Sequence, residues 1–179
     1  MKYSATRFAV AALFVSAGAV SALGATGTGA TQLSVSVLPE ASLTVDTATT
    51  SLTSAVTTFG NFTGATNFTY KIRTAQVGGS GSVKVQITSD FAPTGGPSVG
   101  SPATGDALSY SCTISAPGTA CAGSVNASTT TQTSVGTFGA NARSAKAGNS
   151  GSVSWSLPDD PQYNTGSYSA TATFTLSVV

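Results

Sequence analysis

Apolar and polar residues alternate along most of this chain, in short runs separated by stretches rich in glycine and proline. The longest run covers residues 167–178, where apolar residues occupy every second position and serine or threonine stands between them. Strict alternation of this kind predicts a strand that is buried on one face. We count eight to ten such strands and no helical pattern outside the amino-terminal leader, so the sequence predicts an all-β protein.

One pattern occurs twice, at residues 73–87 and 143–157, with a constant offset of 70 residues. Each copy begins with arginine, continues through a polar loop containing Gly-x-Ser-Gly, and ends in an alternating strand. We expect each glycine-rich segment to be a hairpin turn and the apolar strand residues, Trp155 among them, to lie in the core. Because either half alone would expose an apolar face, we expect one Ig-like antiparallel β-sandwich with internal pseudo-duplication.

The first 24 residues predict a secretory signal peptide, because Lys2 and Arg7 precede the apolar stretch 8–20 and small residues follow it. This stretch is too short to span a bilayer. We expect a flexible tether over residues 25–31 and a single sandwich domain over residues 32–179. The processed chain is expected to be secreted, extracellular or on the outer cell surface, with the periplasm as an alternative, and not inserted in a membrane.

Only 7% of the residues are charged, against roughly a quarter in average soluble proteins. After the leader, five cationic residues stand against six acidic ones, which gives a net charge of −1. The sequence shows no basic patch, so we do not expect nucleic-acid binding. A net charge near zero favours self-association over mutual repulsion.

The chain contains no histidine, which removes the commonest general base and metal ligand. We therefore expect no enzyme and no cofactor. Four aspartates are candidates for a calcium site. Solvation of loops and capping of turns explain these aspartates more simply. A further alternative is a carboxylate pair for glycoside hydrolysis. These candidates are Asp90, Asp106, Asp159 and Asp160.

Cys112 and Cys121 are the two cysteines, and an exported chain with an even count normally oxidises them. We expect a disulfide that closes the short loop between them. A redox role would need a Cys-x-x-Cys spacing, which the sequence lacks.

Leu33, Val35 and Val37 alternate with serines before Pro39, which predicts a first strand. Such a strand can pair within its own sheet or with the open edge of a neighbouring subunit, and both readings stay open. On the last strand, Ala170 and Ala172 would leave shallow positions that an incoming strand could cover. The residues expected to take part in assembly are Leu33, Val35, Val37, Tyr168, Ala170, Ala172, Phe174 and Leu176.

Residues 166–178 resemble the end of bacterial pilin-like and surface-fibre subunits, which often close with Gly-x-Tyr and a long alternating strand. The cysteines depart from chaperone–usher pilins, because they sit close together in mid-chain. The resemblance implies a structural, non-enzymatic subunit that assembles by strand addition with itself or another secreted subunit. The alternative is a non-catalytic carbohydrate-binding module that binds surface glycans, for which Tyr163 and Tyr168 are candidate exposed aromatics.

Overall fold

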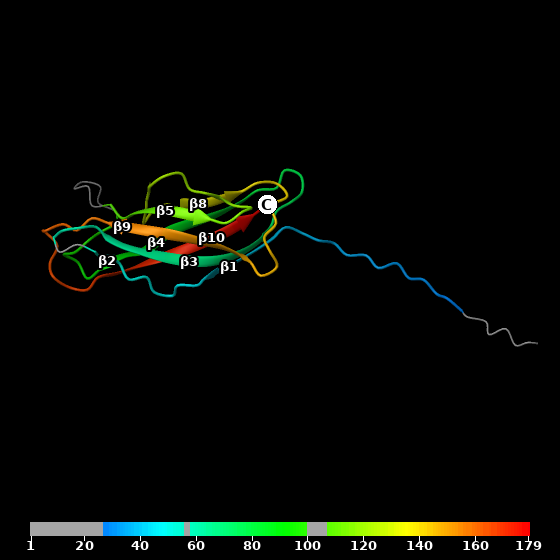
Figure 1. Ribbon diagram of the computed structural model, residues 1–179, viewed down its shortest axis with the longest axis horizontal. Coiled ribbons are helices and arrows are strands. Elements are labelled where there is room, and N and C mark those ends of the chain that lie inside the picture. Colours follow the sequence, from blue (N-terminus) through cyan, green and yellow to red (C-terminus); the bar gives the residue numbers. More distant parts are fainter. Residues whose placement is uncertain (1–26, 56–57, 100–106) are drawn as a thin grey trace, which may run out of the picture. The chain divides into compact units, whose positions relative to one another are not determined.

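A computed structural model describes residues 27–55, 58–99 and 107–179, in which all regular structure is β-strand (Figure 1). The predicted signal peptide and Asp106 lie outside the described residues. Residues 36–179 form one compact unit of two antiparallel sheets packed face to face. The predicted antiparallel β-sandwich is therefore confirmed.

The first sheet contains β1 (Glu40–Val45), β2 (Thr53–Ser54), β3 (Phe62–Arg73), β5 (Ser109–Ile114), β7 (Val125–Asn126) and β9 (Asn149–Leu157). Its strand order is β1-β3-β9-β5-β7, and β2 also pairs with β3. The second sheet contains β4 (Gly81–Ala92), β6 (Thr119–Ala120), β8 (Thr133–Phe138) and β10 (Ser169–Val178). Its order is β10-β4-β8-β6, so β1 and β10 are each the outer strand of a sheet.

The core lies between the sheets and is built from the alternate residues of the long strands. The ring of Tyr70 packs 5.1 Å from that of Phe138, and the ring of Tyr110 packs 5.4 Å from that of Trp155. Trp155 is only 6% exposed, which confirms its prediction as a core residue. The central strands contribute the buried residues Phe68, Tyr70, Ile72, Val83, Val85, Ile87, Val153, Trp155 and Leu157.

The 70-residue offset also relates Phe68 to Phe138, so the internal repeat extends back beyond the two arginines. Extended in this way, it corresponds to two interlocked strand pairs, β3 with β4 and β8 with β9. β3 pairs with β9 in the first sheet and β4 pairs with β8 in the second, so each repeat contributes one strand to each sheet. The cross-strand partners match as well: Phe68 lies opposite Gly151, and the equivalent Phe138 lies opposite Gly81. The pseudo-duplication read from the sequence is therefore present in the pairing of the strands.

The glycine-rich segments do not form the predicted hairpin turns. Residues 74–80 join β3 to β4, and residues 139–148 join β8 to β9, but in both cases the two strands belong to different sheets. Each strand pairs with a strand of the other repeat instead of its own sequence neighbour. The local pattern was read correctly as a turn, but it does not reveal which strands hydrogen-bond to each other.

The strand predicted over residues 33–37 is not formed within this chain. Residues 27–39 contain no strand, and the first strand begins at Glu40. Residues 27–35 do not belong to the compact unit of the sandwich, and Leu33 and Val35 are exposed to solvent. Alternation alone does not make a strand, because a strand also needs a partner that accepts and donates its backbone hydrogen bonds.

Candidate functional site

The outer edge of β10 is the longest free strand edge in the described sandwich. β6 and β7, at the far sides of the two sheets, have only two residues each, and β1 has six. β10 has ten residues without a charge or a proline. Proteins normally blunt their edges with short strands, charges, prolines or bulges, because unpaired backbone groups recruit another strand. The register of β10 shifts only near its start, between Ser169 and Ala172, so most of its edge is regular.

The inward face of β10 is apolar and incompletely covered. Ala172 lies opposite Ile87, and Phe174 lies opposite Val85, so these side chains share the face that points to the core. The partners on β4 are buried, whereas Phe174 is half-buried and Ala172 is exposed. Ala170 is half-buried and packs against the core, so Ala172 is the exposed small side chain of a shallow apolar strip beside the free edge.

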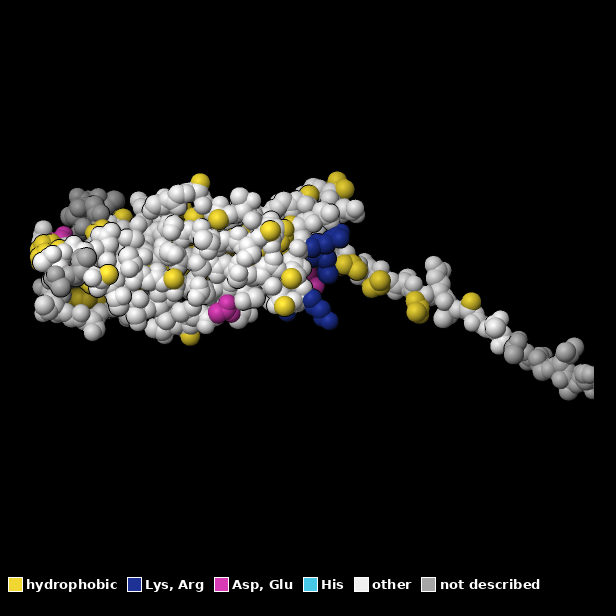
Figure 2. Space-filling model, in the orientation of Figure 1, with side chains coloured by type: hydrophobic (Ala, Val, Ile, Leu, Met, Phe, Trp, Pro, Cys, Tyr) yellow, Lys and Arg dark blue, Asp and Glu magenta, His cyan; other side chains and the backbone are white. Residues whose placement is uncertain are grey.

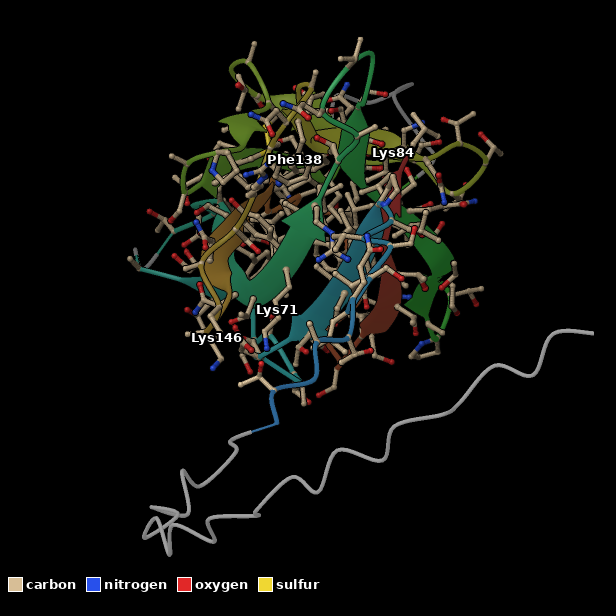
Figure 3. All side chains as sticks on the ribbon, turned by 90° about the vertical axis from the view of Figure 1, so that its right-hand side faces the viewer. Lys71, Lys84, Phe138 and Lys146 are labelled. Atoms are coloured by element: carbon tan, nitrogen blue, oxygen red, sulfur yellow. A yellow bond between two sulfur atoms is a disulfide. The ribbon has the colours of Figure 1, made fainter. Side chains whose placement is uncertain are left out.

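β1 lies beside β10 (Figure 3) and is the shorter of the two strands, with six residues against ten. β1 runs from Glu40, opposite Arg73, to Val45, opposite Phe68, and then ends. The ring of Phe68 packs 5.7 Å from the ring of Phe174. The part of β10 before Phe174, which carries the two alanines, therefore continues beyond the end of β1.

The segment before β1 is apolar and pairs with no strand in the described part of the chain. Leu33, Val35 and Val37 are 90%, 88% and 61% exposed. Leu38 is also exposed, and its carbonyl oxygen accepts a hydrogen bond from Nε of Arg73 at 2.8 Å, which anchors the point where the segment joins the sandwich. Four apolar side chains within six residues are therefore exposed to solvent.

Tyr168 lies one residue before β10 and does not continue its apolar face. Its ring packs against Gly96, and its hydroxyl donates a hydrogen bond to the carbonyl oxygen of Asn164 at 2.7 Å. Tyr163 in the same loop is likewise half-buried. The two tyrosines proposed as exposed aromatics therefore take part in loop packing.

The outer faces of the sheets carry serine and threonine rather than apolar residues. Several hydroxyls pair across strands, among them Thr88 with Thr173 at 2.9 Å and Ser115 with Ser150 at 3.0 Å. Such faces already satisfy part of their hydrogen bonding and offer little apolar area. The half-buried apolar face of β10 therefore differs from these hydroxyl-rich outer faces.

The disulfide between Cys112 and Cys121 is present, as predicted. Cys112 belongs to β5 of the first sheet, and Cys121 directly follows β6 of the second, so the bond ties the two sheets together. Its position is on the side of the sandwich away from β1 and β10. The β10 edge is therefore not held by this covalent link.

The aspartates considered for calcium have hydrogen bonds typical of loop capping. The carboxylate of Asp90 accepts bonds from the backbone N–H groups of Phe91 and Val99, both at 2.8 Å, and from the hydroxyl of Ser98 at 2.7 Å. Burial alone would raise the pKa of Asp90, but these three bonds outweigh it and hold the pKa below its usual value. Oδ1 of Asp160 caps the N–H of Gln162. Among the described residues, no cluster of three or more potential ligands is placed to hold a metal ion.

The fold creates a basic cluster that the sequence did not reveal. Lys71 and Arg73 stand two residues apart on β3, Arg143 forms an isolated bridge opposite Arg73, and Lys146 follows in the same connection. They surround a hollow of about 360 Å³ and face a single carboxylate, that of Glu40, which lies 3.0 Å from Arg73. We call this group of five residues the cationic end. The expectation that the chain has no basic patch was wrong, because four scattered cations meet only after the repeats interlock.

Among the described residues, no helix is long and apolar enough to cross a membrane. Comparisons with protein-family models, with curated proteins and with solved structures find no match. The function is therefore argued from the geometry of the edge, the amino-terminal segment and the charges.

Proposed function

We propose that this protein is a secreted structural subunit that assembles with copies of itself by adding a strand, contributed by residues 32–38 of one copy, to the free edge of β10 in the next. The observation that carries this proposal is the combination of an exposed alternating segment with a long, uncharged strand edge in the same chain. Neither feature has a described partner within the chain. The amino-terminal segment needs backbone hydrogen-bond partners to form a strand, and the free edge of β10 offers them.

The dimensions and chemistry of the two elements support the pairing. Seven extended residues span about 23 Å at roughly 3.3 Å per residue, which is shorter than the ten-residue β10. Leu33, Val35 and Val37 would point to one face of an added strand because alternate residues share a face. That face would cover the strip left open by Ala170 and Ala172. Secretion is supported by the leader pattern and by the disulfide, which forms in oxidising compartments.

The glycan-binding alternative has less support in the described residues. A sugar-stacking site needs aromatic rings that face solvent. Tyr163 and Tyr168 are half-buried in their loop, and Trp155 is in the core. Among the residues that the structure describes, Phe59 is the one large aromatic residue that is clearly exposed.

The test compares three forms of the processed protein by sedimentation and electron microscopy. The full-length form should assemble as concentration rises, whereas a truncation that begins at Glu40 should stay monomeric. Adding a peptide of residues 25–39 should raise the melting temperature of the truncated form, since the peptide would fill the edge. A full-length protein that stays monomeric at high concentration, together with a peptide without effect, would contradict strand addition.

Point variants separate the role of the segment from general effects of charge. Val35→Lys should abolish assembly because it places a charge on the buried side of the added strand. Val77→Lys is a matched control, because Val77 is 89% exposed, nearly the same as Val35 at 88%, but lies in a loop. Ala172→Lys should block the receiving edge, and mixing it with Val35→Lys should leave at most single junctions in which intact segment meets intact edge.

A further inference from the structure

The charges of the sandwich are separated along its strands. The cationic end holds Lys71, Arg73, Arg143 and Lys146 against Glu40, and the single ion pair found among the described residues is Arg73 with Glu40. Figure 2 shows the lysine and arginine side chains gathered at one end of the sandwich. In Figure 3, which looks at that end, Lys71 and Lys146 lie near each other and Lys84 lies apart. Like charges placed this close repel, so the arrangement favours an anionic partner.

The opposite end of the sandwich is acidic. β4 leaves the cationic end at Gly81 and reaches Asp90 about 30 Å away, at roughly 3.3 Å per residue. Asp159 and Asp160 follow the end of β9, and the loop after them is tied to the loop after Asp90 by a hydrogen bond from the N–H of Asn164 to the carbonyl oxygen of Gly95. We call Asp90, Asp159 and Asp160 the acidic end. At neutral pH it carries about three negative charges, against about three net positive charges on the cationic end.

The direction of the chain links these two ends to strand addition. The amino-terminal segment leaves the sandwich at the cationic end, where Arg73 holds the carbonyl of Leu38. β10 begins at the acidic end, where Ser169 pairs with Ala92, and finishes at the cationic end, where Val178 pairs with Gly81. Leu38, where the donor segment joins the sandwich, and the start of the receiving edge are therefore at opposite ends of the same subunit.

We propose that copies stack head to tail, with the cationic end of one subunit against the acidic end of the next. This inference rests on the proposed strand addition and specifies its geometry. In such a stack the donor segment enters the next subunit at the start of β10, beside Ala170 and Ala172, where β1 no longer lies alongside. The segment then runs antiparallel to β10 of the receiving subunit. From residue 32 to residue 38 the segment runs back toward its own subunit, whereas that β10 runs away from the donor subunit.

Head-to-tail contacts of this kind do not close on themselves unless the rotation between subunits happens to form a ring, so they generate filaments. Attraction between unlike ends raises the rate of encounter by tenfold or more at low salt, and screening removes this gain at high ionic strength. Since exposed charges steer association more than they hold a complex together, salt should slow assembly more than it weakens finished filaments.

Charge reversal at each end provides the test, with full-length processed protein and light scattering as the measure of assembly rate. Lys71→Glu with Lys146→Glu makes the cationic end acidic, and Asp159→Lys with Asp160→Lys makes the acidic end basic. Each double variant should assemble at least tenfold more slowly at low salt. The quadruple variant, which restores opposite signs, should recover much of the rate. Lys84→Glu, on the exposed flank of β4, is the control and should change the rate by less than twofold.

The direction of the donor strand is tested with photo-cross-linking residues placed at positions 33 and 37. Antiparallel entry requires position 33 to cross-link to a later residue of β10 than position 37 does, and the reverse order would overturn the stacking. Assembly that is insensitive to all the charge reversals would overturn the stacking and leave strand addition standing. No assembly by the unmodified protein would overturn both.

A polyanion is the competing occupant of the cationic end. If polygalacturonate or duplex DNA binds the unmodified protein but not the Lys71→Glu, Lys146→Glu variant, while the quadruple variant fails to recover assembly, then the cationic end serves an anionic polymer and the stacking is wrong. Recovery by the quadruple variant supports the stacking, because that variant has lost the cations that a polyanion would need.

Discussion

Arg73 and Arg143 lie directly opposite each other across an isolated antiparallel bridge, although both are cationic. They are the first residues of the two repeats, and the bonds around them are reciprocal. The N–H of Thr74 donates to the carbonyl of Ala142, and the N–H of Ser144 donates to the carbonyl of Ile72, both at 3.0 Å. The fold therefore has a local two-fold relationship at this point, which brings each repeat's arginine against its own counterpart.

Replacing one of these arginines should stabilise the monomer. Arg143→Gln should raise the free energy of unfolding by about 0.2–1 kcal/mol, since like charges directly opposite each other are destabilising by that order. Arg143 is the better choice because Arg73 also bonds to Leu38 and Glu40. Urea unfolding at low and high salt would measure the change.

The control for this prediction is Lys84→Gln, which removes a positive charge from an exposed position of β4 away from the pair. The gain from Arg143→Gln should shrink at high salt because the repulsion is screened. A gain that is equal in the two variants, or independent of salt, would show that repulsion between the arginines is not its source.

Gly151 should tolerate no side chain. A Cβ at this position would lie 2.3 Å from the ring of Phe68, which is fully buried and has little room to move. Gly151→Ala should therefore lower the free energy of unfolding by about 1–3 kcal/mol through overpacking. Gly139→Ala is the matched control, because a Cβ there meets no atom within 4 Å, and it should be neutral or slightly stabilising. Thermal melting of the two variants side by side would decide the matter, and equal melting temperatures would contradict the packing argument.

The strands and the core could be predicted because both depend on local alternation. The positions assigned inward on the repeat strands, such as Val83 and Trp155, are buried. The pairing of strands could not be predicted, because it depends on contacts between the repeats, 70 residues apart in sequence. A glycine-rich segment ends one strand and starts another, but it carries no signal of whether the chain returns to the same sheet or crosses to the other.

The same reason explains what was missed in the candidate site. The cations at positions 71, 73, 143 and 146 appear in the sequence as two dilute pairs, and only the interlocking of the repeats turns them into a cluster. The apolar segment around Val35 was recognised from its alternation. Whether it forms a strand could not be predicted, because that depends on a partner strand that is distant in sequence or belongs to another chain. The sequence predicted that the alanines of the last strand leave shallow positions on its apolar face, and the exposure of Ala172 is consistent with this prediction.

The hydrogen bond between Trp155 and Thr66 should contribute to stability beyond the burial of the indole. Nε1 of Trp155 donates to the hydroxyl of Thr66 at 2.9 Å, and both residues are buried. Thr66→Val keeps the shape but leaves the indole N–H without this acceptor, which should cost about 1–3 kcal/mol. Trp155→Ala should cost more, about 3–5 kcal/mol, because it also leaves a cavity.

Trp155 is the single tryptophan of the chain, so its fluorescence reports on this site directly. The emission should be blue-shifted and protected from soluble quenchers in the native protein. Thr63→Val is the control for Thr66→Val, because Thr63 is also on β3 but is exposed, and it should leave the free energy of unfolding nearly unchanged. Red-shifted emission that is freely quenched would contradict the burial of the indole.

Asp90 should make the protein less stable in acid. Burial opposes the charge of its carboxylate, but the bonds from Ser98, Val99 and Phe91 favour it more and lower the pKa in the folded state. A group with a lowered pKa stabilises the fold above its unfolded pKa of about 3.9, and that contribution is lost as the pH falls through the folded value. Part of the stability seen at pH 7 should therefore disappear below about pH 4.

Asp90→Asn tests this directly, because the amide keeps the size of the carboxyl but cannot carry the charge. The variant should lose about 1–3 kcal/mol of unfolding free energy at pH 7, as expected when charged hydrogen bonds are weakened. The difference from the unmodified protein should narrow as the pH is lowered below about 4, where the native carboxyl also becomes neutral. Asp159→Asn is the control, since its carboxylate has no hydrogen-bond partner among the described residues. Urea unfolding from pH 2 to pH 7 would measure both variants, and a constant gap for Asp90→Asn across that range would mean that its charge does not hold the loop.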